Sequence, residues 1–164
     1  MSMTEFQTVF GSLKDYTKGE LLIINDNPKY YTFSNVFDVA NRSKPYEKVI
    51  VAINLEYVIE TLRAEGTSDW YTAPHDEFCV VMDGEVEVEL VQLDAPMTAG
   101  KGSVKVQGDP KGRKMGRLKL KRGHQGLLPH GAAYRFKANN VSVMLLQTIK
   151  GPLSVEKWAE ICYT

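Results

Sequence analysis

Apolar and polar residues alternate along much of the middle of this chain. Residues 85–90 read EVEVEL, in which glutamates alternate with valine and leucine, and residues 116–121 read GRLKLK, in which basic residues alternate with leucine. A period of two residues is typical of a strand that is buried on one face. By this pattern, and by short β-branched and aromatic runs, the sequence predicts strands over residues 20–24, 30–39, 48–53, 56–63, 78–82, 85–93, 117–121, 125–128, 132–137 and 142–149.

Turn residues separate these segments. Asp83-Gly84 and Asn139-Asn140 each lie at the end of a predicted strand, where their backbone preferences favour a tight turn. Residues 94–112 are rich in glycine, alanine and proline, which predicts a long connection of the kind that is often functional or mobile. Many short strands with frequent turns indicate an all-β barrel or sandwich.

The two ends of the chain follow a helical pattern instead. Apolar residues at helical spacing predict an amphipathic helix over residues 4–16. Ser154 is a favourable N-cap for a second short helix, which would place Trp158 on its apolar side. We therefore divide the chain into an N-terminal helical arm (residues 1–19), a barrel (residues 20–150) and a C-terminal helix (residues 151–164).

Aromatic side chains at both ends are candidates for a subunit interface. Phe6 and Phe10 belong to the apolar side of the first predicted helix, and Trp158 belongs to that of the second. Aromatic residues are enriched where two subunits meet, so these three could anchor a partner. They could equally pack on their own barrel, and the sequence leaves both interpretations open.

Charge is distributed unevenly along the chain. Residues 1–109 contain 18 acidic and 9 basic side chains, whereas residues 110–155 contain 10 basic side chains and no acidic one. Nucleic acid is a poor candidate for a partner, because the basic segment has no helical pattern and few aromatic residues between its charges. We expect instead that the acidic strand at 85–90 pairs with the basic strand at 117–121 across the sheet. A charged partner surface is the alternative.

The bulk properties fit a cytoplasmic protein with no membrane segment. A chain of 164 residues with 43% hydrophobic residues can form one domain with a sizeable core. No apolar run approaches the roughly 20 residues that span a bilayer, and the start of the sequence, MSMTEFQTVF, does not read as a secretory signal. Its two cysteines, Cys79 and Cys162, are too few and too far apart for a disulfide framework or a zinc knuckle.

Two spacings of glycine, proline and glutamate resemble the motifs of the cupin superfamily. Glu77 is followed after six residues by Gly84, and Gly123 is followed after five residues by Pro129 and then, one residue later, by Gly131. These positions suit tight turns between strands of a small antiparallel barrel. The resemblance implies an all-β fold, a single cupin barrel (double-stranded β-helix or jelly roll) with short N- and C-terminal helices.

Metal-binding cupins hold their ion with three histidines and one glutamate, and the resemblance assigns those positions in this chain. The assigned positions are Tyr71, Ala73, Glu77 and Tyr134, so only the glutamate is present. Alanine has no ligand atom and a neutral phenol is a poor ligand for a divalent ion, which predicts that this chain has no metal site and no catalytic residue of its own.

The three histidines of this chain lie near these motifs, but none of them stands at a ligand position. We expect His75, together with Glu77, to be a polar residue of the barrel interior near its mouth, and His124 does not fit a ligand position. A rearranged metal site formed by His75, Glu77 and His130 is the alternative. If that site existed, the chain would be an active iron dioxygenase in its own right.

Longer stretches resemble the small (alpha) subunit of two-subunit hydroquinone 1,2-dioxygenase. They are EFQTVFGSLKDYTKGELLIINDNPKYYTFSNVF, AINLEYVIETLRAEG and LLQTIKGPLSVEKWAEICYT, which start at residues 5, 52 and 145. The resemblance implies an α2β2 heterotetramer, in which a larger cupin subunit holds Fe(II). That subunit would cleave hydroquinone to 4-hydroxymuconic semialdehyde during 4-nitrophenol degradation. The small chain would then carry no cofactor, and would stabilise and cap its catalytic partner.

A stand-alone role is the second hypothesis. A metal-free cupin could bind or isomerise a small molecule inside its barrel, where Tyr71, His75, Glu77 and Tyr134 would line the site and Glu77 would act as general base. Such a protein should be stable alone, whereas a helper subunit should need its larger partner.

Overall fold

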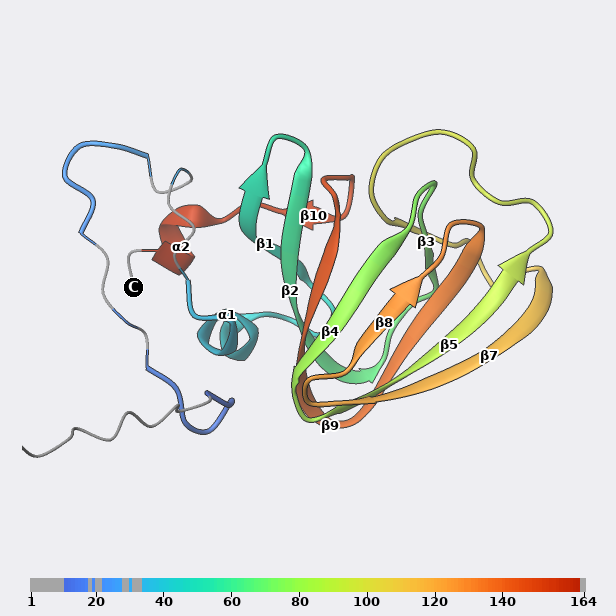
Figure 1. Ribbon diagram of the computed structural model, residues 1–164, viewed down its shortest axis with the longest axis horizontal. Helices are drawn as coiled ribbons and strands as arrows, with labels where there is room; N and C mark the ends of the chain where they lie inside the picture. The colour runs from blue at the N-terminus through green and yellow to red at the C-terminus, as the bar shows by residue number, and fades with distance from the viewer. Residues whose placement is uncertain (1–10, 18, 20–21, 28–29, 31–33, 163–164) are drawn as a thin grey trace, which may run out of the picture.

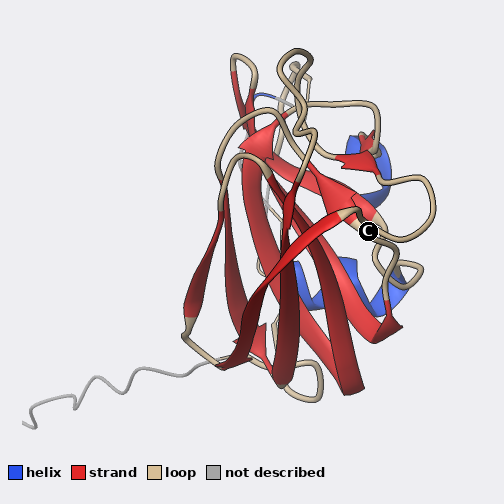
Figure 2. Ribbon diagram, turned by 90° about the vertical axis from the view of Figure 1, so that its right-hand side faces the viewer, coloured by secondary structure: helices blue, strands red, loops and turns tan. Residues whose placement is uncertain are grey.

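The computed structural model describes residues 11–17, 19, 22–27, 30 and 34–162. Within these residues the chain forms a curled antiparallel sheet with two short helices at one side (Figures 1 and 2). The elements are α1 (Val36–Arg42), β1 (Lys48–Asn54), β2 (Tyr57–Thr67), β3 (Tyr71–Thr72), β4 (Glu77–Asp83), β5 (Glu85–Leu93), β6 (Val104–Lys105), β7 (Gly112–Lys121), β8 (Gln125–Leu128), β9 (Ala132–Ile149), β10 (Ser154–Val155) and α2 (Trp158–Cys162).

Strand β9 connects the two halves of the barrel. Its first part pairs with β3 and β5, and its second part pairs with β2 and β4. Strands β1 and β10 extend the sheet beyond β2, while β8 extends it beside β4 and β7 extends it beside β5. The curled sheet is the cupin fold that the sequence predicts, and it has two short helices beside it, although neither helix has the bounds that the sequence predicts.

Inward-facing residues of this sheet form the main core. Successive side chains of a strand point to opposite faces, so alternate residues of β2, β4, β5 and β9 meet inside the barrel. Leu62, Val88, Phe136, Met144 and Leu146 are each fully buried there. The interior is therefore packed with side chains along most of its length.

The two helices cover the outer face of β1. Asn35 is the N-cap of α1, and its side chain accepts hydrogen bonds from the amides of Phe37 and Asp38. Val39 of α1 and Ile161 of α2 pack with valines of β1 in a second, smaller core. The first part of β1, residues 48–51, is consequently buried on both faces, which explains its run of apolar residues after Lys48.

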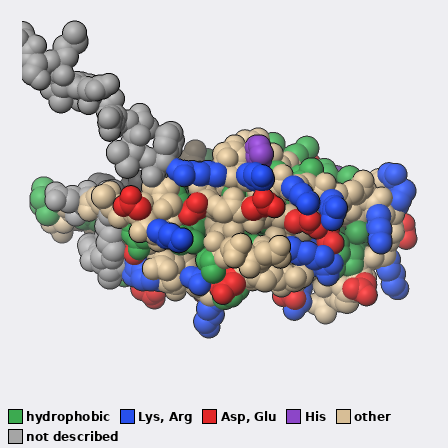
Figure 3. Space-filling view, turned by 90° about the horizontal axis from the view of Figure 1, so that it is seen from below, with side chains coloured by type: hydrophobic (Ala, Val, Ile, Leu, Met, Phe, Trp, Pro, Cys, Tyr) green, Lys and Arg blue, Asp and Glu red, His purple; other side chains and the backbone are tan. Residues whose placement is uncertain are grey.

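Opposite charges pair across β5 and β7, as the alternation predicts. Glu85 lies opposite Lys121 and Glu87 lies opposite Lys119. The Glu87 carboxylate is 3.5 Å from Arg117 of the neighbouring pair. Acidic and basic side chains are mixed over the lower side of the molecule (Figure 3). Acidic and basic residues that are separated along the sequence thus lie side by side on this sheet.

Some predicted elements are wrong in kind or in extent. The strand predicted over 30–39 is wrong for residues 36–39, which belong to α1, and residues 31–33 lie outside the described residues. The Asn35 cap and the Asp38–Arg42 ion pair one turn apart favour the helix. Ser154 does not begin the last helix: it belongs to β10, which pairs in parallel with β1, and α2 begins at Trp158. Most of the helix predicted over 4–16 lies outside the described residues, but residues 11–16 are not helical. Residues 22–24 form no strand.

No helix in the described part of the chain is long and apolar enough to cross a membrane.

Candidate functional site

Glu77, at the start of β4, is the centre of a buried polar cluster. Its inward position follows from the alternation of β4, in which Glu77, Cys79 and Val81 are completely buried. The Tyr134 hydroxyl donates to Oε1 of Glu77 at 2.7 Å, and the Ser103 hydroxyl donates to Oε2 at 2.7 Å. Both carboxylate oxygens therefore have a short hydrogen bond inside the protein.

The long connection between β5 and β7 supplies Ser103 to this cluster. The Ser103 hydroxyl is also 3.1 Å from the Tyr134 hydroxyl, so the three side chains form one network. The residue before it, Gly102, donates its amide to Nε2 of His75 at 2.9 Å. His75 is half-buried, and its role in the structure is to hold this connection against the barrel.

Two further ionisable side chains face the same interior. Lys48 of β1 is 2% exposed and Glu60 of β2 is 1% exposed. The Lys48 ammonium lies 3.5 Å from the Ser103 hydroxyl and 4.5 Å from the centre of the Tyr71 ring. Glu60 accepts a hydrogen bond of 2.5 Å from the hydroxyl of Ser154. The cluster thus contains one basic and two acidic groups.

Burial dominates the acid–base properties of these groups. It lowers the pKa of Lys48, although the carboxylates of Glu60 and Glu77 act in the opposite direction. It raises the pKa of Glu60, which the nearby Lys48 opposes. Burial also raises the pKa of Tyr71 to about 12, and burial next to Glu77 raises the pKa of Tyr134 well above its usual value. Both phenols are neutral at physiological pH, and that of Tyr134 donates to Glu77.

The residues at the cupin ligand positions do not fit a metal ion. Tyr71 and Tyr134 are buried neutral phenols whose rings lie 5.8 Å apart, and Ala73 has no ligand atom. Glu77 is the remaining position, and its two oxygens are already hydrogen-bonded. Within the described ranges, no group of three or more histidine, cysteine, aspartate or glutamate side chains is arranged to hold a metal.

The alternative ligand set of His75, Glu77 and His130 is not brought together. His130 is exposed, and its Nε2 lies 3.3 Å from the carbonyl oxygen of Met97. His75 binds the backbone amide of Gly102, while Glu77 binds two hydroxyl groups inside the barrel. His124 lies on the surface, where its Nδ1 accepts the amide of Lys121.

Of the three candidate interface residues, the structure describes Trp158. Phe6 and Phe10 lie outside the described residues. Trp158, the first residue of α2, is partly buried against the small core that contains Val39, Val49 and Ile161. Its indole also donates to Glu156 at 3.3 Å. Trp158 therefore packs on its own barrel, and whether it also contacts a partner stays a prediction.

Sequence reasoning missed Lys48, Glu60 and Ser103. A signal existed for Glu60, because it replaces an apolar residue on the face of β2 that also carries Val58 and Leu62. Lys48 gave a weaker signal at the start of an apolar strand. Ser103 gave none, since its approach to Glu77 depends on the path of a long connection.

This chain is similar in sequence and structure to chains in solved structures of hydroquinone 1,2-dioxygenase. It is 58% identical to a chain of the crystal structure of hydroquinone 1,2-dioxygenase PnpCD in complex with Cd2+ and 4-hydroxybenzonitrile, with a TM-score of 0.91 over 99% of this chain and 100% of that chain. It is 52% identical to a chain of hydroquinone 1,2-dioxygenase from Sphingomonas sp. TTNP3 with 4-hydroxybenzoate bound, with a TM-score of 0.89 over 98% and 99%.

A longer chain also has the same fold. In hydroquinone 1,2-dioxygenase PnpCD in complex with Fe3+, a chain matches 85% of this protein over 40% of its own length, with a TM-score of 0.59. The identity is 11%, so this match concerns the fold alone. Comparisons with protein-family models and with curated protein sequences gave no match.

Proposed function

The chain belongs to the hydroquinone 1,2-dioxygenase family, and from this premise we propose that it is the non-catalytic small subunit of a two-component, Fe(II)-dependent enzyme. The larger cupin subunit would hold the iron and cleave hydroquinone to 4-hydroxymuconic semialdehyde during 4-nitrophenol degradation. The two kinds of chain would form an α2β2 heterotetramer in the cytoplasm.

The filled ligand positions are the observation that supports a non-catalytic role. Tyr71, Ala73 and Tyr134 stand where the cupin motif calls for histidine, and Glu77 is occupied by hydrogen bonds from Tyr134 and Ser103. Oxygen activation at iron needs ligands as well as open positions for the substrate. Among the described residues, no group of three or more histidine, cysteine, aspartate or glutamate side chains is arranged as such a ligand set, so we assign no step of the ring cleavage to this chain.

The need for a larger partner is supported by the related structures. A chain of this protein's length and a longer chain with the same fold both occur in structures of PnpCD. Iron in the longer partner would supply the oxygen chemistry. The present chain would stabilise that partner by binding its folded form and would help to exclude water from its active site.

Trp158, Phe6 and Phe10 remain our candidates for contacts with the partner. Trp158 packs against its own small core but keeps part of its ring accessible, and aromatic residues with this double character are common at interfaces. Replacing Trp158 by alanine would test the assignment if co-purification of the larger chain is measured beside the stability of the small chain. A loss of stability with unchanged co-purification would contradict an interface role.

Co-expression tests the proposal directly. This chain, the larger subunit and both together would be purified and assayed with ferrous iron and hydroquinone, following the absorbance of the semialdehyde. We expect activity only when both chains are present, with the iron content following the larger chain. Ring cleavage by the small chain alone, or full and stable activity of the larger chain alone, would reject a helper subunit.

A further inference from the structure

The Lys48 ammonium lies among the residues that occupy the cupin ligand positions. It is 4.5 Å from the centre of the Tyr71 ring and 6.0 Å from the centre of the Tyr134 ring. It is also 3.5 Å from the Ser103 hydroxyl, which binds Glu77 directly. These contacts come from β3, β9 and the connection before β6, so they surround the ammonium from several directions.

We infer that Lys48 supplies an internal cation that takes the place of the metal ion in this barrel. Metal-binding cupins place their ion between the side chains at these positions, and here the same positions enclose a covalently attached positive charge. Aromatic faces attract such a charge when it is shielded from water, and both tyrosine rings are available for this.

Two buried carboxylates, those of Glu60 and Glu77, require a nearby positive charge. Glu60 and Glu77 are 1% and 0% exposed, and an uncompensated charge at either position would be strongly destabilising. Glu77 has two hydroxyl donors, but Oε2 of Glu60 has no hydrogen-bond partner in the described part of the chain. The Ser103 hydroxyl lies 3.5 Å from the Lys48 ammonium and donates to Glu77, while Ser154, the register partner of Lys48 on β10, donates to Glu60. Each buried carboxylate is therefore linked to Lys48 through one serine.

An internal cation makes the fold of this chain independent of metal supply. A bound ion can be removed by a chelator, whereas a lysine side chain is covalently part of the protein and cannot be removed in this way. The inference concerns this chain alone and does not require the larger partner. Its tests measure folding stability, so their failure is distinct from a failure of the proposed function.

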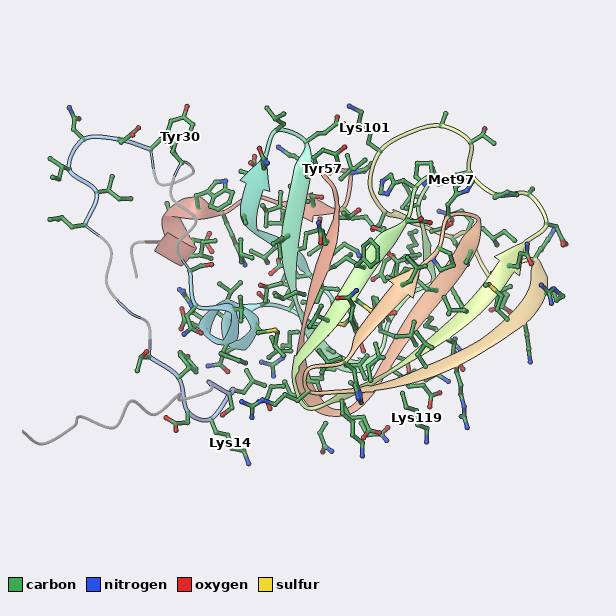
Figure 4. All side chains as sticks on the ribbon, viewed as in Figure 1. Lys14, Tyr30, Tyr57, Met97, Lys101 and Lys119 are labelled. Carbon is green, nitrogen blue, oxygen red and sulfur yellow. The ribbon has the colours of Figure 1, made fainter. Side chains whose placement is uncertain are left out.

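Chemical rescue of a Lys48→Ala variant is the first test. The full-length variant should melt roughly 10 °C lower than the parent chain, because two buried carboxylates lose their counter-charge. Propylammonium should raise the melting temperature of the variant, while propanol of the same shape should raise it much less. The parent chain and a Lys119→Ala control, in which an exposed lysine is shortened (Figure 4), should respond equally little to both compounds. Equal effects of propanol and propylammonium on Lys48→Ala would overturn the inference.

If Lys48→Ala does not fold, a double-mutant cycle tests whether Lys48 and Glu77 are energetically coupled. The cycle consists of the parent chain, Lys48→Met, Glu77→Gln and the double variant. Lys48→Met should lower the melting temperature at least twice as much in the parent chain as in the Glu77→Gln background, because the neutral glutamine no longer needs a cation. Equal losses in both backgrounds would mean that Lys48 and Glu77 are not coupled, which would overturn the inference.

Discussion

The Tyr134 hydroxyl donates a hydrogen bond of 2.7 Å to Oε1 of Glu77, although the two residues are 57 positions apart in sequence. Both stand at positions where metal-binding cupins carry ligands. A pair of ligand positions thus forms a hydrogen-bonded pair inside the barrel, and we expect this bond to contribute to the stability of the fold.

Tyr134→Phe should destabilise the chain by about 1–3 kcal/mol, because it removes one donor from a fully buried carboxylate and leaves the ring in place. Urea unfolding would measure the loss. Tyr30→Phe is the matched control, since Tyr30 is 74% exposed and points away from the barrel (Figure 4). Equal free energies of unfolding for the two variants would contradict the importance of the Tyr134–Glu77 bond.

Glu89→Gln should make the chain less dependent on pH in the acidic range. Hydrogen bonds from Lys137 and Arg135 hold the pKa of Glu89 below its usual value of 4.5. The ionised carboxylate therefore stabilises the folded state at pH values above 4.5, and this stabilisation is lost as the pH falls through the lowered pKa of the folded state.

The free energy of unfolding of Glu89→Gln should thus be about 1 kcal/mol below that of the parent at pH 7, and the two should converge in acid. The expected difference is modest because the side chain of Glu89 is 25% exposed. Glu87→Gln serves as control, since its partner Arg117 is 3.5 Å away and 64% exposed. A difference between Glu89→Gln and the parent that grows in acid would refute this account.

The thiol of Cys79 should react only when the barrel opens. Cys79 is completely buried, and burial raises the pKa of its thiol to about 11. A thiolate is the reactive form, so both effects slow its modification. In a Cys162→Ser background, a disulfide reagent should label Cys79 slowly in buffer and rapidly in denaturing urea. Rapid labelling of the folded chain would mean that the interior is accessible.

Gly102→Ala should disturb the connection that brings Ser103 to Glu77. Gly102 has φ +72°, and an added Cβ would lie 2.5 Å from the Cα of Gly151 and 2.6 Å from the carbonyl oxygen of Ile149. We expect a loss of about 2–4 kcal/mol from backbone strain and overpacking together. The loss would be measured by urea unfolding.

Gly108→Ala provides the matched control for this experiment. Gly108 has nearly the same backbone angle, φ +69°, but no atom lies within 4 Å of the added Cβ. Its loss should be limited to the strain of the left-handed conformation, about 1–2 kcal/mol. If both variants lost the same free energy, close packing of the connection against residues 149–151 would not be important.

The strand pattern was predictable because it is local. Alternation along EVEVEL and GRLKLK predicted both the strands and the pairing of their charges, which the register of β5 and β7 confirms. The helix at 36–42 was missed because its β-branched and aromatic residues favoured a strand, although Asn35 and the spacing of Asp38 and Arg42 pointed to a helix.

The candidate site was predictable only in part. Glu77 could be placed inside the barrel because it begins a strand with an apolar inner face. Its hydrogen bonds could not be predicted, because Ser103 and Tyr134 reach it from positions 26 and 57 residues away in sequence. Such contacts depend on the path of the connections in space, which cannot be predicted from secondary-structure propensity or from hydrophobic periodicity.

The position of β9 has a consequence for how the protein is made. This strand, Ala132–Ile149, is the neighbour of β2, β3, β4 and β5, yet the ribosome synthesises it after all of them. Until it emerges, the nascent polypeptide holds apolar strands with open edges, which are prone to aggregate. Chaperones should therefore engage translation intermediates that end before residue 132 and release the chain once that last long segment has left the exit tunnel.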